Sequence, residues 1–123
     1  MKQLFFLAAA LAMSAAPTYA QDAVMVDSKH YTIEFENDQV RVLRISYGPG
    51  EKSVMHEHPA GVAVFLTDAR TTFTLPDGTI VPNDAKAKSV VWDAGGKHLP
   101  ANVSDDSFEL ILVELKNTAA STN

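Results

Sequence analysis

The amino-acid sequence predicts an all-β protein, a sandwich or barrel built from short strands. Three observations lead to this prediction: short runs of apolar and β-branched residues, frequent turn residues between them, and the lack of a long amphipathic helical pattern. Turns are expected at Asn37-Asp38, Gly48-Pro49-Gly50, Asp77-Gly78, Asn83-Asp84, Gly95-Gly96 and Ser104-Asp105-Asp106.

The individual strands follow from these runs in chain order. Residues 31–36 alternate in polarity, and residues 40–47 are rich in β-branched and large apolar side chains. The pattern of 40–47, VRVLRISY, leaves open which of its two arginines faces inward. Residues 71–75 and 79–81 enclose Pro-Asp-Gly, the residue types of a tight hairpin turn. The remaining strands are expected at 62–66, 89–92 and 108–115.

The last expected strand, FELILVEL, carries apolar side chains on both of its faces. One face has Phe108, Leu110 and Leu112, and the other has Ile111, Val113 and Leu115. A small barrel has a single interior, so the second face should meet another segment or another subunit. This pattern predicts a homodimer.

The N-terminal residues have the pattern of a secretory signal peptide. A lysine at position 2 precedes an apolar run from Leu4 to Met13, which is too short to anchor the chain in a bilayer, and small residues lead to Ala20. Cleavage is therefore expected after Ala20, which places the protein in the periplasm or outside the cell without a stable membrane anchor. The predicted organisation is a signal peptide at 1–20, one β-barrel domain at 21–116 and a disordered tail at 117–123.

Composition excludes several classes of function. Without residues 1–20 the chain keeps 9 basic and 15 acidic residues, a formal charge of −6, which would repel phosphate backbones and anionic lipid. We therefore expect no nucleic-acid partner. The chain has no cysteine, which excludes thiol chemistry and thiolate metal ligands. Any metal must be bound by histidine and oxygen ligands.

The histidines are the residues with the clearest chemical potential. His56 and His58 are two positions apart, so in a strand both project to the same face, where their nitrogens could converge on one ion. A pair with this spacing is also compatible with two solvated residues. His98 follows a Gly-Gly turn far along the chain, and a barrel could bring it to the same place. His30, which has no second candidate ligand nearby in the sequence, is expected to be solvated.

The two histidine segments together resemble the two motifs of the cupin superfamily, which are small barrels of the double-stranded β-helix or jelly-roll type. In the first motif, Gly50, His56 and His58 are in register. In the second motif, Gly95, His98 and Asn102 match, with Asp93 where the family has proline. The resemblance covers nearly the whole chain after the expected signal peptide.

The resemblance implies a divalent metal bound by His56, His58 and His98, with Asn102 beside these ligands. Iron, zinc, nickel and manganese are the candidate ions. The family's glutamate ligand would stand at Val62 or Ala63, and neither side chain can bind a metal. The family's closing glycine is absent as well. We therefore expect an all-imidazole ligand set.

The expected function follows from this site and remains open between two classes. A three-histidine site would suit an exported metal-dependent enzyme, for example a small-molecule dioxygenase. The alternative is a non-enzymatic barrel that binds a small ligand or a metal. Without a carboxylate ligand the metal retains more positive charge, so the small-molecule ligand is expected to be anionic.

Overall fold

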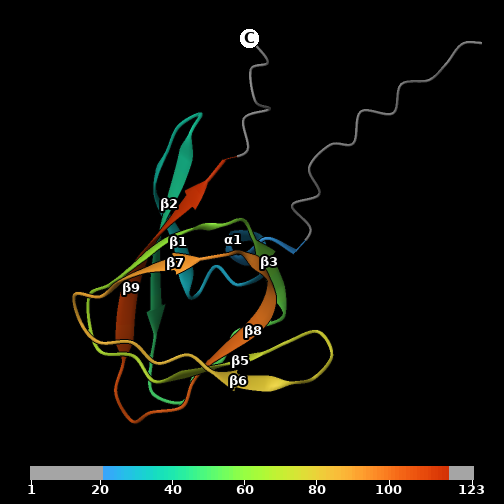
Figure 1. Ribbon diagram of the computed structural model, residues 1–123, viewed down its shortest axis with the longest axis vertical. Coiled ribbons are helices and arrows are strands. Elements are labelled where there is room, and N and C mark those ends of the chain that lie inside the picture. The colour runs from blue at the N-terminus through green and yellow to red at the C-terminus, as the bar shows by residue number, and fades with distance from the viewer. Residues whose placement is uncertain (1–20, 117–123) are drawn as a thin grey trace, which may run out of the picture.

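The computed structural model describes residues 21–116, which form two antiparallel sheets (Figure 1). The expected signal peptide at 1–20 and the expected tail at 117–123 lie outside the described residues. Within the described part, no helix is long and apolar enough to cross a membrane. The elements are α1 (Ala23–Val26), β1 (Tyr31–Glu36), β2 (Val40–Tyr47), β3 (His56–His58), β4 (Gly61–Phe65), β5 (Thr71–Thr74), β6 (Ile80–Pro82), β7 (Val90–Asp93), β8 (Gly96–Asn102) and β9 (Phe108–Leu115). The all-β prediction is confirmed.

The strand order shows how segments far apart in the sequence meet. The first sheet has the order β1-β2-β9-β4-β7 and the second has the order β3-β8-β5-β6. The chain crosses repeatedly between the sheets, so β4 and β7 pair across about 30 residues in the first sheet, while β3 and β8 pair across about 40 residues in the second. The hairpin of β5 and β6 extends from one side of the molecule (Figure 1).

The core lies between the inner faces of the two sheets. In β2 the side chains of Leu43, Ile45 and Tyr47 are buried, and they share the inner face with Arg41 because side chains alternate along a strand. Arg44 lies on the outer face, where it pairs with Glu34 and Glu109 on the neighbouring strands. Of the two arginines in residues 40–47, Arg41 is therefore the one that faces inward. The core residues are Ala23, Tyr31, Leu43, Ile45, Tyr47, Ala63, Phe65, Ala69, Phe108, Leu110 and Leu112.

Two elements were not expected from the sequence. Strand β8 contains Gly96 and Pro100, residue types that weaken the strand signal, yet it pairs with β3 on one side and β5 on the other. Helix α1 has only four residues and begins after Asp22, whose side chain accepts a hydrogen bond from the Val24 amide. Both elements contact the candidate site.

Candidate functional site

The structure brings His56, His58 and His98 together at one end of the barrel. His56 and His98 face each other directly across the ladder between β3 and β8, and His58 lies on the same face as His56. The ring centres are 5.0 Å apart for His56 and His98, 4.7 Å for His58 and His98, and 6.2 Å for His56 and His58. The three residues predicted as one site are therefore neighbours in space.

The imidazole of His56 is held by its Nδ1 atom. That atom is 2.9 Å from the carbonyl oxygen of Val54 and 3.2 Å from Oγ of Ser53, and since a carbonyl can only accept, Nδ1 carries the proton. Ser53 in turn donates to Asp27. The Nε2 atom of His56 is buried and has no hydrogen-bond partner. This tautomer leaves a free lone pair on Nε2, which is the arrangement of a metal-binding histidine whose other nitrogen is fixed by a carbonyl.

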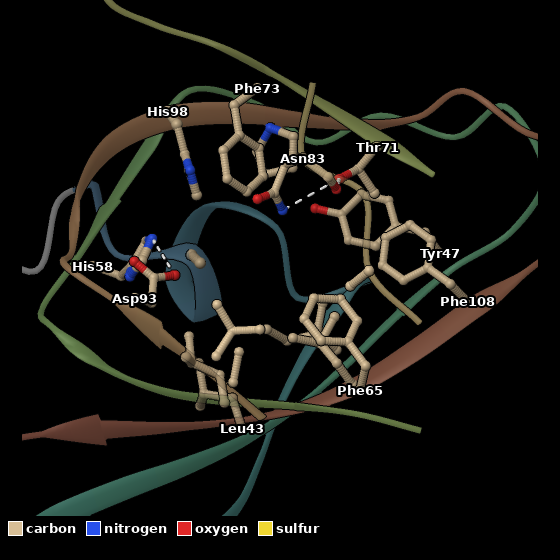
Figure 2. Close-up of a pocket in the computed structure, with 18 of the residues that line it drawn as sticks. Leu43, Tyr47, His58, Phe65, Thr71, Phe73, Asn83, Asp93, His98 and Phe108 are labelled. Carbon is tan, nitrogen blue, oxygen red and sulfur yellow. Dashed lines mark hydrogen bonds and ion pairs between the residues drawn. The ribbon is translucent and has the colours of Figure 1, made fainter. Parts of the chain in front are cut away.

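His58 has a similar arrangement with an additional carboxylate partner. Its Nδ1 donates to the carbonyl oxygen of Pro59 at 3.1 Å, and its Nε2 lies 3.7 Å from Oδ2 of Asp93 (Figure 2). The all-imidazole ligand set stays a prediction, but a carboxylate that was not among the candidate ligands lies beside His58. Asp93 was not considered because the strand was expected to end at residue 92, whereas β7 continues to Asp93 and places its side chain at the site. The sequence did contain one indication of its role, because Asp93 stands where the second motif usually has proline.

His98 is neutral at physiological pH. Burial, with smaller contributions from the neighbouring His58 and His56, lowers its pKa from 6.5 to about 3. Burial also lowers the pKa of His56. The ring of Phe73 lies against His98 with a centre-to-centre distance of 4.2 Å. At least two imidazoles in the cluster are thus uncharged, as a metal ligand must be.

The position of the missing glutamate agrees with the sequence analysis. Ala63 is buried on the inner face of β4, opposite Leu112, while Val62 occupies the outer face. The family's ligand position is therefore filled by a methyl group or directed away from the interior.

The types of ligand atom in the cluster suit a metal ion, but the side chains are not oriented to bind one. Two imidazoles bound to one ion at about 2 Å have ring centres about 4.5–6 Å apart, a range that includes the distances from His98 to the other two histidines. Imidazole nitrogen with a nearby carboxylate is also a common ligand set for divalent transition metals. Among residues 21–116, however, no three histidine, aspartate or glutamate side chains are placed as they stand to hold an ion. Metal binding would require the ring nitrogens to turn toward one another.

A cavity of about 220 Å³ adjoins His58, His98 and Asp93 (Figure 2). At its other end lie the rings of Tyr47 and Phe108, which stack on each other with centres 4.9 Å apart. The rest of the wall is mainly apolar, with contributions from Leu43, Ile45, Ala63, Phe65, Phe73, Leu110 and Leu112. Thr71 and Asn83 add polar groups near Tyr47 (Figure 2). A mainly apolar pocket with a few polar groups is typical of small-molecule sites.

One residue of the pocket wall, Glu114, belongs to a buried ion-pair network. Arg41 donates from Nε to Glu114 at 2.6 Å and from Nη1 and Nη2 to Asp22 at 2.6 and 2.9 Å. Glu114 is 1 % exposed, and burial raises its pKa although Arg41 lowers it. The Oε2 atom of Glu114 has no partner. Sequence reasoning missed Glu114 because it lies at the end of a strand that was interpreted by its apolar residues.

The backbone at Gly95 packs closely against residues 58–60, at the end of the strand that carries His58. Gly95 has φ +76°, and a Cβ atom there would lie 2.6 Å from the Ala60 amide nitrogen and 2.9 Å from the His58 carbonyl oxygen. The corner between β7 and β8 can therefore pack against residues 58–60 only with glycine at this position.

Two further residues named by the sequence analysis lie away from the histidine cluster. Asn102 is buried and joins loops, donating to the carbonyl oxygens of Gly48 and Asp106 and accepting from Ser104. The prediction that His30 is solvated is wrong. His30 is buried, stacks on Tyr47 and contacts Asp27 at 2.7 Å through Nδ1, because the turn after α1 folds it under the barrel.

Comparison with known proteins identifies the fold. A cupin domain from Bordetella pertussis Tohama I superposes with a TM-score of 0.65 and 25% sequence identity, covering 70% of this chain and 91% of that one. A protein with a double-stranded β-helix domain from Klebsiella pneumoniae has a TM-score of 0.57 and 17% identity, covering 72% of this chain and 77% of its own. A variant of oxalate decarboxylase from B. subtilis has a TM-score of 0.52 and 18% identity, covering 67% of this chain but 22% of the enzyme. No family model and no curated protein matches the sequence.

Proposed function

We propose, from the cupin fold that the chain shares with these structures, that it binds a divalent metal ion through His56, His58 and His98 beside a small-molecule pocket. The observation that supports this most directly is the buried Nε2 atom of His56, which has no partner and lies within a cluster of three imidazoles. A buried acceptor without a partner is costly and rare in folded proteins. A metal ion would satisfy it.

The chemistry of such a site would depend on the groups that hold the two imidazoles of β3. Val54 and Pro59 hold the Nδ1 atoms of the two β3 histidines, so that Nε2 is the nitrogen offered to a ligand. Asp93 lies beside His58 and can bind the ion or orient that ring. Bound there, a divalent metal supplies Lewis acidity toward a small molecule in the adjoining pocket.

A second candidate function is a metal-free barrel that binds a small molecule with the histidines as polar wall residues. The specific observation in its favour is that the donor atoms within residues 21–116 do not converge as they stand. The neutral state of His98 is compatible with both functions, since an uncharged imidazole serves equally as a hydrogen-bonding group.

Metal loading of the purified protein separates the two functions. Protein stripped with EDTA is titrated with Fe²⁺ under anaerobic conditions, and with Zn²⁺, Ni²⁺ and Mn²⁺, while bound metal and thermal unfolding are measured. We expect about one equivalent of one of these ions and a stabilisation of about 2.7 kcal/mol at a hundredfold excess over the Kd. Replacing His56 with glutamine should abolish both effects.

His30→Gln is the matched control, because His30 is also buried with an unpartnered Nε2 but is not a proposed ligand and is linked to His56 by hydrogen bonds only through Asp27 and Ser53. That variant should load metal as the wild type does. Less than about a tenth of an equivalent in the wild type, with no stabilisation by any of the four ions, would exclude the metal site and leave the metal-free barrel.

A further inference from the structure

The pocket wall has an unbalanced charge. Three of the residues that line it are acidic, Asp84, Asp93 and Glu114, and none of the lining residues that the structure describes is lysine or arginine. The two histidines in the wall are His58 and His98. A molecule in this pocket would therefore meet three acidic residues and no lysine or arginine in the wall itself.

Glu114 is the acidic residue whose surroundings point to a ligand. Its side chain is almost completely buried, and one oxygen accepts from Arg41 while the other, Oε2, has no partner. Arg41 is shared with Asp22, so its single positive charge faces two carboxylates. The network formed by these three groups keeps a formal charge of −1 when both carboxylates are ionised. A buried charge of this kind is costly unless another group neutralises it.

The strand register places Glu114 and Asp93 on either side of Gly61, which has no side chain. Gly61 on β4 pairs with Asp93 on β7 and with Glu114 on β9, so the two acidic residues flank a residue without a side chain. Any Cβ atom at Gly61 would lie 2.2 Å from the Val113 carbonyl oxygen, which explains why glycine occupies this position. The two carboxylates therefore stand in one row at the same level of the barrel.

Aromatic rings form much of the remaining wall. The rings of Phe65, Phe73 and Phe108 line the pocket. Aromatic faces attract cations through the ring quadrupole and accommodate apolar groups equally well. The wall thus combines an apolar surface with a negative end.

We propose that this pocket binds a small, mainly apolar molecule that carries one protonated amine, with Glu114 Oε2 as the principal acceptor and Asp93 as the second. The proposal rests on the pocket of the proposed function and does not depend on the metal. It differs from the expectation of an anionic ligand, which was based on a metal ion without a carboxylate ligand. In the metal-free pocket the acidic wall residues favour a cation instead.

The experiment compares three probes of similar shape and different charge. Benzylamine, benzyl alcohol and benzoate are titrated at pH 7 into EDTA-stripped protein, and Kd values are measured by NMR chemical-shift perturbation or calorimetry. We expect benzylamine to bind about tenfold more tightly than benzyl alcohol, a difference of about 1.4 kcal/mol, and benzoate to bind most weakly. Benzyl alcohol binding as tightly as benzylamine, benzoate binding most tightly, or no binding of benzylamine would each overturn the proposal.

The substitution Glu114→Gln tests the assigned acceptor. Glutamine keeps the size of the side chain and can still accept from Arg41, so the preference for benzylamine over benzyl alcohol should fall to near unity while the affinity for benzyl alcohol changes little. Glu109→Gln is the matched control, because Glu109 lies on the same strand and also pairs with an arginine, but on the outer face. It should retain the full preference.

A charge preference that survives in Glu114→Gln would overturn the assignment of Glu114. Thermal unfolding of both variants identifies any loss of folding, which would lower the affinity for benzyl alcohol as well. Failure of the metal site appears separately in the loading experiment, because that experiment measures bound metal and this one is performed without it.

Discussion

Three buried side-chain atoms lack a hydrogen-bond partner in the part of the chain that the structure describes: Nε2 of His30, Nε2 of His56 and Oε2 of Glu114. Folded proteins leave few such atoms, and each therefore calls for a physical explanation. Two of the three belong to the histidine cluster and to the pocket wall, where a ligand could satisfy them. At the scale of single residues, the site is recognised by unsatisfied hydrogen-bonding capacity rather than by charge alone.

The low pKa of His98 predicts a loss of stability in acid. Below pH 6.5 the unfolded chain takes up a proton at His98, whereas the folded chain does so only near pH 3, so the free energy of unfolding falls as pH decreases through this window. His98→Gln removes this effect. In urea unfolding of metal-free protein, the wild type should lose about 1–3 kcal/mol more than the variant between pH 7 and pH 4.

The control for this measurement is His30→Gln, which leaves the histidine cluster intact. Contributions from His56 and Glu114 are present in both wild type and His98→Gln, so they cancel in the comparison. Equal pH dependence of the wild type and His98→Gln would show that His98 takes up its proton normally in the folded protein.

At the scale of elements, the site depends on the short pairing of β3 with β8, which the sequence only partly predicts. The alternation of polarity and the Pro-Asp-Gly turn predicted β1, β2 and the hairpin of β5 and β6 to within one or two residues. Strand β8 was missed because Gly96 and Pro100 contradict local strand preference, and tertiary pairing with β3 and β5 outweighs that preference. The sequence groups the three histidines only through the resemblance to two motifs. That Glu114 and Asp93 lie near each other follows only from how β7 and β9 pair with β4.

Gly95 offers a test of how the corner between β7 and β8 supports the site. Gly95→Ala should destabilise the protein through both its positive φ and the clash with the backbone of residues 58–60. Gly78→Ala is the matched control, since Gly78 also has a positive φ but a Cβ atom there meets nothing within 4 Å. Urea unfolding should show a loss of about 1 kcal/mol for Gly78→Ala and of more than about 2 kcal/mol for Gly95→Ala. Similar losses would mean that the corner shifts to accommodate a side chain.

At the scale of the whole molecule, the outer face of the five-stranded sheet carries a continuous apolar row. In register across the sheet, Phe35 pairs with Val42, Val42 with Val113, Val113 with Val62, and Val62 with Trp92. Phe35 is 54 % exposed and Trp92 is 60 % exposed. The second apolar face of β9, from which a homodimer was expected, is thus the centre of a larger surface. A row that spans every strand of the sheet is suited to pack against its own copy around a twofold axis.

The homodimer remains a prediction with a direct measurement. Static light scattering at micromolar concentration should give twice the mass of the single chain for the wild type and the mass of one chain for Phe35→Lys. Ile80→Lys is the control, because Ile80 is also exposed but lies on β6 in the other sheet. A wild type that is a single monodisperse monomer under these conditions would contradict the prediction.

Asp22, just before α1, helps to hold the strand that carries His56 and His58. Strand β3 lies at the edge of its sheet and is held by three residue pairs to β8, and on its other side Asp22 forms a parallel bridge with Glu57. The same Asp22 grips Arg41 through two hydrogen bonds. Opening of this short ladder would separate His56 from His98. By holding the free edge of β3, the bridge at Asp22 thereby helps to keep the two histidines adjacent.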